Sequence, residues 1–418
     1  MTADGVGEMG SLYSNNVRRP RAHTSPYITN YIYERNPLQV IWWSAAFPGA
    51  GHMALCKYFS GALLMAWEFF INVKAHVNEA IFYSMVGDFQ LAAEVIDTRW
   101  FFLYMGIYIF TMWDSYSTAI DLNKFSRLAD RNDSPIKPFK IGALEVNFLD
   151  YRKPWNGVFW SFITPGLGAV YANRLPTGFF VTICFVLTVY HSNVLPAVLL
   201  TFEGATELAG SVIDPQWFLN FPSIILTSVS STYSDILFTN SLFKIEQSRY
   251  LKRNFQPKEF RMPNKRKGSR VMHFISSFQH SAFLELALSD LEQNGISKEH
   301  IFVAPLDKNS PDLPDVKNTH IEATSKYELA FILGCIFMLL GSIYGFIWTW
   351  GPIIWALIGL VFGGVLGLVL SFIFMRRKWF RKKTQTEVVL IVECEKEKSE
   401  IVEKVLWGHK AIGVMKTN

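Results

Sequence analysis

The sequence predicts a polytopic α-helical membrane protein that carries an α+β cytoplasmic domain. Three observations lead to this fold class: 50% of the 418 residues are apolar, only 18% are charged, and the mean hydropathy is +0.18. A soluble protein of this length would carry about 25% charged residues. The composition excludes a disordered chain and a collagen-like repeat. The cysteines are scattered and mostly lie in apolar runs, so neither a zinc site nor a disulfide framework is expected.

Six stretches are predicted to cross the membrane, because about 20 apolar residues span a hydrocarbon core roughly 30 Å thick. They lie near residues 57–73, 100–122, 174–190, 217–240, 328–349 and 352–375. The polar stretch before the first of them does not have the pattern of a signal peptide.

Basic residues predict the orientation of these spans. Seven Lys and Arg lie within 124–153, ten within 244–270 and six within 376–383, whereas 74–99 has two and 191–216 has none. The positive-inside rule therefore places both termini and all basic loops in the cytoplasm. The net charge of +5 then reflects this topology and contact with the lipid bilayer, and nucleic acid is not an expected partner.

An internal duplication covers the first four spans. A shift of 117 residues superimposes 35–123 on 152–240 without a gap, and about a quarter of the positions are identical. The identities continue through the loops as well as the spans, which compositional bias does not explain. Each unit spans the membrane twice, so the two repeats are predicted to be parallel.

Each repeat begins with a short apolar segment, 38–47 or 155–164, which ends at a Pro-Gly-x-Gly break and is followed by a cation. Ten apolar residues cannot cross a bilayer, so this segment is either re-entrant or interfacial. Proline removes a backbone donor and glycine frees the dihedral angles, and the cation can reach the headgroups. These repeat-motif residues are Pro48, Gly49, Gly51 and Lys57 in the first unit, and Pro165, Gly166, Gly168 and Arg174 in the second.

The carboxy-terminal part alternates strands and helices. Strands are predicted at Val271–Phe278 and His300–Leu306 around a helix at Gln279–Asn294, with Phe283, Leu284 and Leu288 on one face of that helix. The same strand–helix–strand order recurs at Glu387–Cys394, Lys396–Trp407 and Ala411–Lys416. Two such units fit one ferredoxin-like domain that a transmembrane hairpin interrupts.

The glycines of this hairpin recur at four-residue spacing, which allows two helices to approach closely. We expect them to pack the hairpin itself, with oligomerisation as the alternative. They are Gly341, Gly345, Gly359, Gly363 and Gly367.

The segment from Leu291 to Val303 has the sequence LEQNGISKEHIFV. It precedes the hairpin, whose regularly spaced glycines form a glycine zipper, and the second strand–helix–strand unit. Together they resemble a bacterial general-stress membrane family with a ferredoxin-like domain that such a hairpin interrupts, over residues 270–418. The resemblance implies a stress- or sporulation-related protein of a bacterial cell membrane, and that family supplies no catalytic residues. Residues 35–240 also resemble duplicated two-helix membrane modules with a Pro-Gly-x-Gly turn.

The predicted organisation follows from these boundaries. It comprises a cytoplasmic tail (1–34), membrane repeat 1 (35–123), a basic linker (124–151), membrane repeat 2 (152–240), a second basic linker (241–269), the first half of the ferredoxin-like domain (270–306), an acidic linker (307–326), the hairpin (327–377) and the second half (384–418).

Ionisable residues inside the predicted spans are the candidate functional residues, because a charge at mid-membrane costs at least ~2.5–3.5 kcal/mol on insertion scales. Glu68 and Asp114 are expected at similar depth, and Asp235 lies one turn from the equivalent of Asp114. They either serve transport or bind Tyr116, Ser117, Tyr233 and Ser234 and fix helix packing.

No phosphate loop, nucleotide fingerprint, zinc-protease helix or nucleophile elbow is present, so neither an enzyme nor a cofactor is expected. The first functional hypothesis is a non-enzymatic membrane scaffold whose cytoplasmic module binds a protein or self-associates, through that module or through the glycine zipper. The alternative is a channel or transporter for an ion or small solute that uses the intramembrane acids.

Overall fold

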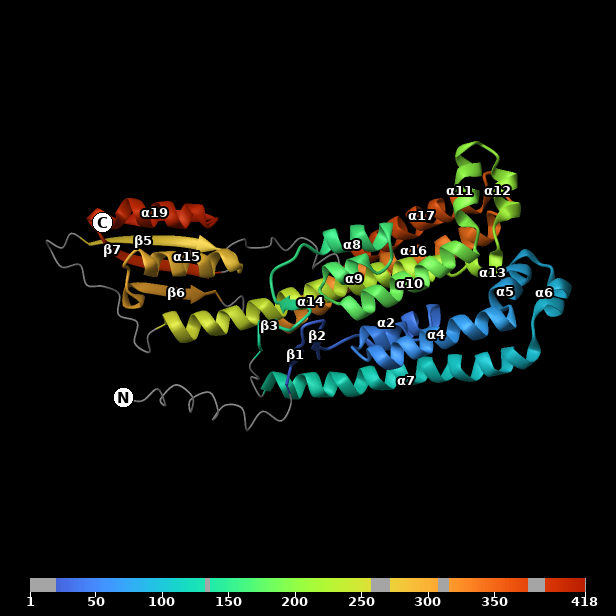
Figure 1. Ribbon diagram of the computed structural model, residues 1–418, viewed down its shortest axis with the longest axis horizontal. Coiled ribbons are helices and arrows are strands. Elements are labelled where there is room, and N and C mark those ends of the chain that lie inside the picture. The colour runs from blue at the N-terminus through green and yellow to red at the C-terminus, as the bar shows by residue number, and fades with distance from the viewer. Residues whose placement is uncertain (1–19, 132–135, 257–270, 307–315, 375–387, 418) are drawn as a thin grey trace. The chain divides into compact units, whose positions relative to one another are not determined.

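The computed structural model describes residues 20–131, 136–256, 271–306, 316–374 and 388–417, and 69% of the structure is helical (Figure 1). Parts of the expected tail, linkers and hairpin end lie outside these ranges. The chain divides into two compact units. The first contains Met1–Phe148, Lys153–Leu237 and His320–Trp379, and the second contains Leu149–Arg152, Phe238–Thr319 and Phe380–Asn418.

Two of the described helices are long and apolar enough to cross a membrane: the Tyr327–Tyr344 part of α16 (Val316–Tyr344) and α17 (Gly351–Phe374). A third candidate is the pair α10 and α11, which bends by 63° at the break between Leu175–His191 and Val194–Phe202. The other expected spans are also helical, in α4, α7 and α14, but they carry more polar residues.

The duplication is present in the structure, and nearly every element of one repeat has its counterpart 117 residues later. The first repeat contains β1 (Ala22–Thr24), β2 (Thr29–Tyr31), α2 (Pro37–Ala46), α3 (Ala50–Ala54), α4 (Tyr58–Ala75), α5 (Val77–Val86), α6 (Phe89–Val95) and α7 (Thr98–Arg131). The second contains β3 (Phe139–Ile141), β4 (Val146–Phe148), α8 (Pro154–Ile163), α9 (Leu167–Tyr171), α10, α11, α12 (Thr206–Val212), α13 (Pro215–Phe218) and α14 (Phe221–Phe255).

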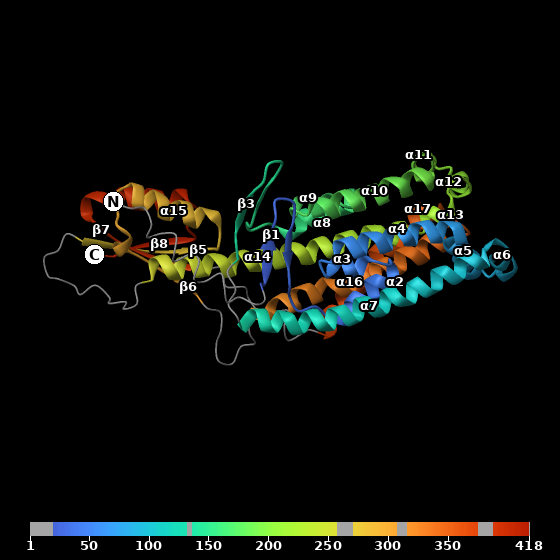
Figure 2. The ribbon, with the colours of Figure 1, turned by 60° about the horizontal axis from the view of Figure 1, so that its bottom comes forward.

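The repeat begins earlier than the sequence comparison indicates. The hairpin β1–β2 lies in the stretch expected to be a polar tail, and β3–β4 lies in the stretch expected to be a basic linker. Figure 2 shows both hairpins, and they contact each other: Asn147 donates to the carbonyl of Ser25 at 2.8 Å, and Thr24 donates to the carbonyl of Lys137 at 3.0 Å. The second expected linker also begins as helix, because α14 continues to Phe255.

The Pro-Gly-x-Gly breaks are turns that only glycine fits. Gly49 has φ +96° and Gly166 has φ +102°, and a Cβ atom on them would lie 2.5 Å and 2.3 Å from the carbonyl oxygens of Gly61 and Gly178. The break therefore lets the chain turn back onto the following helix. The short segments before the breaks are the ten-residue helices α2 and α8.

An asparagine at the end of each repeat binds the chain at its start. Asn123 accepts from the backbone N–H of Arg35 and donates to its carbonyl, both at 2.8 Å. Asn240 makes the same two bonds with Arg152, at 2.8 and 2.7 Å. This amide satisfies the backbone before α2 and α8, and it explains why both repeats end in asparagine.

The glycines of α16 and α17 line the contact between these two helices. A Cβ atom would lie 2.1 Å from the Trp355 carbonyl oxygen at Gly341, and 2.0 Å from the Phe337 carbonyl oxygen at Gly359. Gly345, Gly363 and Gly367 face backbone atoms of the hairpin at 2.3 to 2.5 Å. The space that a side chain would need at each of these five glycines is thus occupied by backbone of the hairpin.

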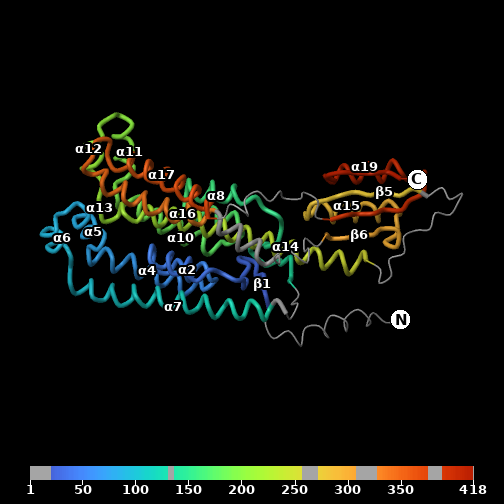
Figure 3. The backbone as a smooth tube through the Cα atoms, turned by 180° about the vertical axis from the view of Figure 1, so that it is seen from behind, coloured from blue at the N-terminus to red at the C-terminus, as the bar shows by residue number. Residues whose placement is uncertain are grey.

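The second unit contains a four-stranded antiparallel sheet in the order β6-β7-β5-β8. Figure 3 labels β5 and β6 of this sheet together with α15 and α19. Its strands are β5 (Val271–Phe278), β6 (Ile301–Pro305), β7 (Val388–Glu395) and β8 (Gly413–Thr417), and its helices are α15 (Ala282–Gln293) and α19 (Ser399–Gly408). Ile275 pairs with Ile391, so both halves of the sequence pattern contribute to one sheet, as expected.

The core of this unit lies between one face of the sheet and the helices. Alternating strand residues such as Phe274 and Leu390 pack against Leu284 and Leu288 of α15. Phe283 does not join them as expected: its ring is 39% exposed and lies under the ammonium group of Lys410. The buried face of α15 is therefore narrower than its apolar sequence indicates.

Candidate functional site

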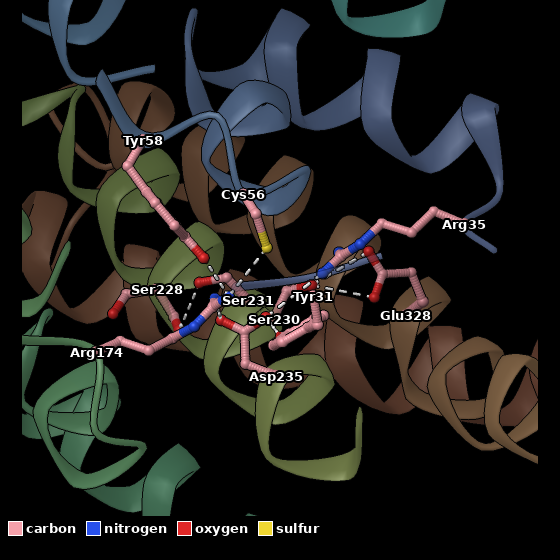
Figure 4. A network of polar contacts seen from close by, with 10 residues as sticks. All are labelled: Tyr31, Arg35, Cys56, Tyr58, Arg174, Ser228, Ser230, Ser231, Asp235 and Glu328. Atoms are coloured by element: carbon pink, nitrogen blue, oxygen red, sulfur yellow. Dashed lines mark hydrogen bonds and ion pairs between the residues drawn. The ribbon is translucent and has the colours of Figure 1, made fainter. Parts of the chain in front are cut away.

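A cluster of buried charges joins the two repeats (Figure 4). We call it the Asp235 cluster. Its members come from β2, from the segments before α2, α4 and α10, and from α4 and α14: Tyr31, Arg35, Cys56, Tyr58, Arg174 and Asp235.

Asp235 accepts hydrogen bonds from three side chains. Arg174 donates to its Oδ2, whereas the hydroxyl of Tyr31 and the guanidinium of Arg35 donate to its Oδ1, at 2.7 and 3.4 Å. The side chains of Arg174 and Asp235 are each only 4% exposed. Burial raises the pKa of Tyr31 well above its usual value, so this hydroxyl stays protonated and donates the hydrogen bond to Asp235.

Arg174 also reaches into the first repeat. Its Nη2 donates to the hydroxyl of Tyr58 and to the Cys56 Sγ, the latter at 3.4 Å. Cys56 has φ +62°, which turns the chain between α3 and α4 toward the guanidinium. A planar group with five donors can bind all of these acceptors at once, which an ammonium cannot do with the same geometry.

The first repeat has an equivalent but more open pair. Lys57, the counterpart of Arg174, lies 3.6 Å from Asp114 and 3.4 Å from the Thr118 hydroxyl. The side chains of Lys57 and Asp114 are 41% and 29% exposed, and the buried His52 Nε2 lies 2.8 Å from the same carboxylate. Thr118 is the counterpart of Asp235, so the acid has moved by one helical turn between the repeats while the cation has kept its place.

Glu328, at the start of the apolar part of α16, is a buried acid that the sequence analysis did not select. Its carboxylate accepts from the indole N–H of Trp43 and from the Ser230 hydroxyl, at 3.0 and 3.2 Å to the two oxygens. It is 4% exposed. Glu328 thereby connects α16 with α2 of the first repeat and α14 of the second, and its charge balances that of Arg35.

Glu68 belongs to a second network between the repeats. Asn72 donates to Glu68 at 3.0 Å and to Asn78 at 3.2 Å, and Gln216 of α13 donates to Asn72 at 2.6 Å. Asn78 in turn donates to the carbonyl of Gln216 at 2.9 Å. This network joins α4 and α5 of the first repeat to α13 of the second.

The structure does not bring the three predicted acids together. Glu68 and Asp235 lie in separate networks, and Asp114 lies on the open pair of the first repeat. The expected hydrogen-bond partners are also different. Asp114 contacts Lys57 and His52, and Asp235 contacts Arg174 and Tyr31. The Tyr233 ring instead packs against Trp155 and Tyr327, and Tyr116 is 36% exposed.

Two small cavities lie beside the Asp235 cluster, of about 40 and 30 Å³. Arg35, Trp43 and Glu328 line the first, and Thr227 and Ser231 line both. A water molecule needs at least about 10–15 Å³ of such space, so the first has room for a few waters. Glu68, Asp114 and Asp235 line neither cavity.

Within the described ranges, no three His, Cys, Asp or Glu side chains are grouped closely enough to hold a metal ion. Comparisons of the chain with protein-family models, with curated proteins and with solved structures found no match. The site is a network of hydrogen bonds and ion pairs in which two guanidinium groups, of Arg35 and Arg174, are balanced by two carboxylates, of Asp235 and Glu328.

Proposed function

We propose that this chain is a non-enzymatic polytopic scaffold of a bacterial cell membrane, with both termini in the cytoplasm. Its duplicated helical part anchors a ferredoxin-like module that binds a protein partner or a second copy. The strand order of that module supports the assignment: counted along the chain it reads 2-3-1-4 with every neighbour antiparallel, the order of a split βαβ pair.

The observation that carries the proposal is that each buried acid is held by its own local donors. Asp235 accepts from two guanidinium groups and a hydroxyl, Glu328 from an indole and a hydroxyl, and Glu68 from the amide of Asn72. A transport pathway needs ionisable groups that share a wetted space and can change partners. Because the acids border no common cavity, the geometry favours a rigid anchor over a channel.

The module supplies a surface for interaction. Its sheet is covered by helices on one face, and on the other face the paired residues Ile275 and Met415 are 36% and 60% exposed. Exposed apolar side chains gathered on one face are typical of interaction sites.

The first test is a flux assay on the full chain in proteoliposomes that contain a pH-sensitive dye. The scaffold predicts no proton or cation flux above that of empty vesicles, and no effect of Glu68→Gln or Asp114→Asn. A pH-dependent flux that either substitution abolishes would support the channel and overturn the scaffold.

The second test addresses orientation and association. Cysteines placed at Gly87 and Gly204 should react with an impermeant reagent from outside, and one at Thr417 should not. Crosslinking of the full chain in native membranes should give a specific adduct that Met415→Asp removes, whereas Leu286→Asp, an exposed change on α15, should leave it intact. An adduct pattern that is the same in both variants would exclude the open sheet face as the binding surface.

A further inference from the structure

The hairpin β3–β4 exposes large apolar side chains on one face. Phe139 and Ile141 on β3 point to the same side as Val146 on β4, because alternate residues share a face and Ile141 pairs with Val146. Phe139, Ile141 and Val146 are 54%, 68% and 42% exposed, and Leu144 at the turn is 83% exposed.

The duplicated hairpin β1–β2 shows the opposite pattern. The counterparts of Ile141 and Val146 are Thr24 and Thr29, and each is only 6% exposed. Tyr31 on the same face of β1–β2 is also buried, so protein covers that face, whereas nothing in the described chain covers the apolar face of β3–β4. A hairpin surrounded by water would not gather apolar side chains on an uncovered face, since apolar surface is stabilised by removal from water.

The neighbourhood of the hairpin indicates what covers this face. α8 begins six residues after β4 and also exposes aromatic side chains, with Trp155 at 53% and Phe159 at 57%. Tryptophan at a helix end is typical of the membrane interface. Lys137, two residues before β3, is exposed, and its positive charge matches an anionic lipid surface. Lys140 lies between Phe139 and Ile141 and therefore points to the opposite face of the hairpin.

The hairpin is also held in a fixed position. Asn147 binds Ser25 and Thr29, and a Cβ atom on Gly142 would lie 2.5 Å from the ring of Pro26. Its apolar face is thus presented by a supported element.

We propose that the β3–β4 hairpin inserts its apolar face into the cytoplasmic leaflet of the membrane, with Lys137 at the phosphates of anionic lipids. The bound partner is the lipid surface itself. This inference rests on the membrane location proposed above. It adds a contact that the helical spans do not require.

The test uses the full chain in vesicles of phosphatidylcholine and phosphatidylglycerol, with an environment-sensitive fluorophore on a cysteine at position 144. The matched control is the equivalent turn position of the first hairpin, Tyr27→Cys, and the unsubstituted protein gives the background labelling. We expect the probe of Leu144→Cys to be quenched by lipids that carry a shallow spin label, and its quenching by iodide to be several-fold weaker than at position 27.

The lysines provide a second readout. A cation near an anionic surface contributes about 1 kcal/mol, so Lys137→Gln should lower the ratio of inserted to free hairpin about fivefold. Lys140→Gln, on the opposite face of the hairpin, should change this ratio little. The same substitutions should have little effect in pure phosphatidylcholine.

Three outcomes would overturn the inference: free access of iodide to position 144, protection from iodide without quenching by lipid, or an effect of the lysines that does not depend on lipid charge. The second would identify a protein segment or a second copy as the cover. A probe at Val365→Cys, in the middle of α17, separates this failure from failure of the membrane location, because it should be quenched by deep spin labels in either case.

Discussion

Arg174 and Lys57 occupy equivalent places in the two repeats, so one substitution at both positions measures what burial adds to the cation. We consider Arg174→Met and Lys57→Met, which keep most of the apolar stem and remove the charge. Arg174 and its partner Asp235 are 4% exposed, whereas Lys57 and Asp114 are 41% and 29% exposed.

The expected magnitudes differ because the environments differ. Removing one partner of a buried ion pair costs about 3–5 kcal/mol, since it leaves an uncompensated charge. Arg35 and Tyr31 remain bound to Asp235, which places Arg174→Met near the lower end of that range. An exposed pair contributes about 0–1 kcal/mol, so Lys57→Met should be almost silent.

The assay is thermal unfolding of the full chain in detergent, followed by tryptophan fluorescence. At roughly 1–2 °C per kcal/mol for a chain of this size, Arg174→Met should lower the midpoint by at least roughly 3 °C and Lys57→Met by no more than roughly 2 °C. The double variant Arg174→Met with Asp235→Leu should lose less than the sum of the two single variants, because it leaves neither charge of the pair buried alone. Equal shifts at positions 174 and 57, or strict additivity in the double variant, would refute the reasoning.

Three further predictions concern other parts of the chain. Leu288→Asp should unfold both halves of the sheet together, because a buried carboxylate without a partner costs several kcal/mol. Hydrogen exchange in β5 and β7 should then rise in parallel, and protection that persists in one strand would contradict a single core. Gly359→Leu should lower the unfolding midpoint by forcing α16 and α17 apart, whereas Gly364→Leu should not, because a Cβ atom there meets nothing within 4 Å. Equal effects of the two substitutions would exclude close packing as the reason for glycine at position 359. Burial and the nearby Glu285 raise the pKa of Glu246 to about 7, so this carboxyl binds a proton in the folded state that it releases in the unfolded state. The free energy of unfolding should therefore fall as the pH rises from about 4.5 to 7. In Glu246→Gln the pH dependence of hydrogen exchange in α15 should flatten, and an unchanged slope would exclude this carboxyl as its source.

Local patterns in the sequence were sufficient for much of the fold. The register of 117 residues, the Pro-Gly-x-Gly breaks and the strands β5 and β7 follow from side chains close together in the chain, and the structure contains all of them. The hairpins β1–β2 and β3–β4 escaped prediction because their strands have only three residues each and show no usable alternation.

The site was less predictable, because its contacts join distant positions. The acid Asp235 could be selected from its place in a predicted span, but Tyr31 and Arg35, which bind it, lie 204 and 200 residues away. Glu328 lies 285 residues from Trp43 and sits at the edge of its apolar run, where an acid is normally solvated. Its position at the start of the apolar part of α16 was the one signal in the sequence, and only the packed structure gives it a meaning.

The pairing of the sheet has a consequence for the order in which the protein is made. β5 pairs only with β7 and β8 among the described strands, and β6 pairs with β7, so the two strands synthesised first share no ladder with each other. Every backbone bond of the sheet therefore requires residues 388–417. Until these residues are synthesised, β5 and β6 present open edges, which are prone to aggregation. A chain truncated before residue 388 would thus expose both strands.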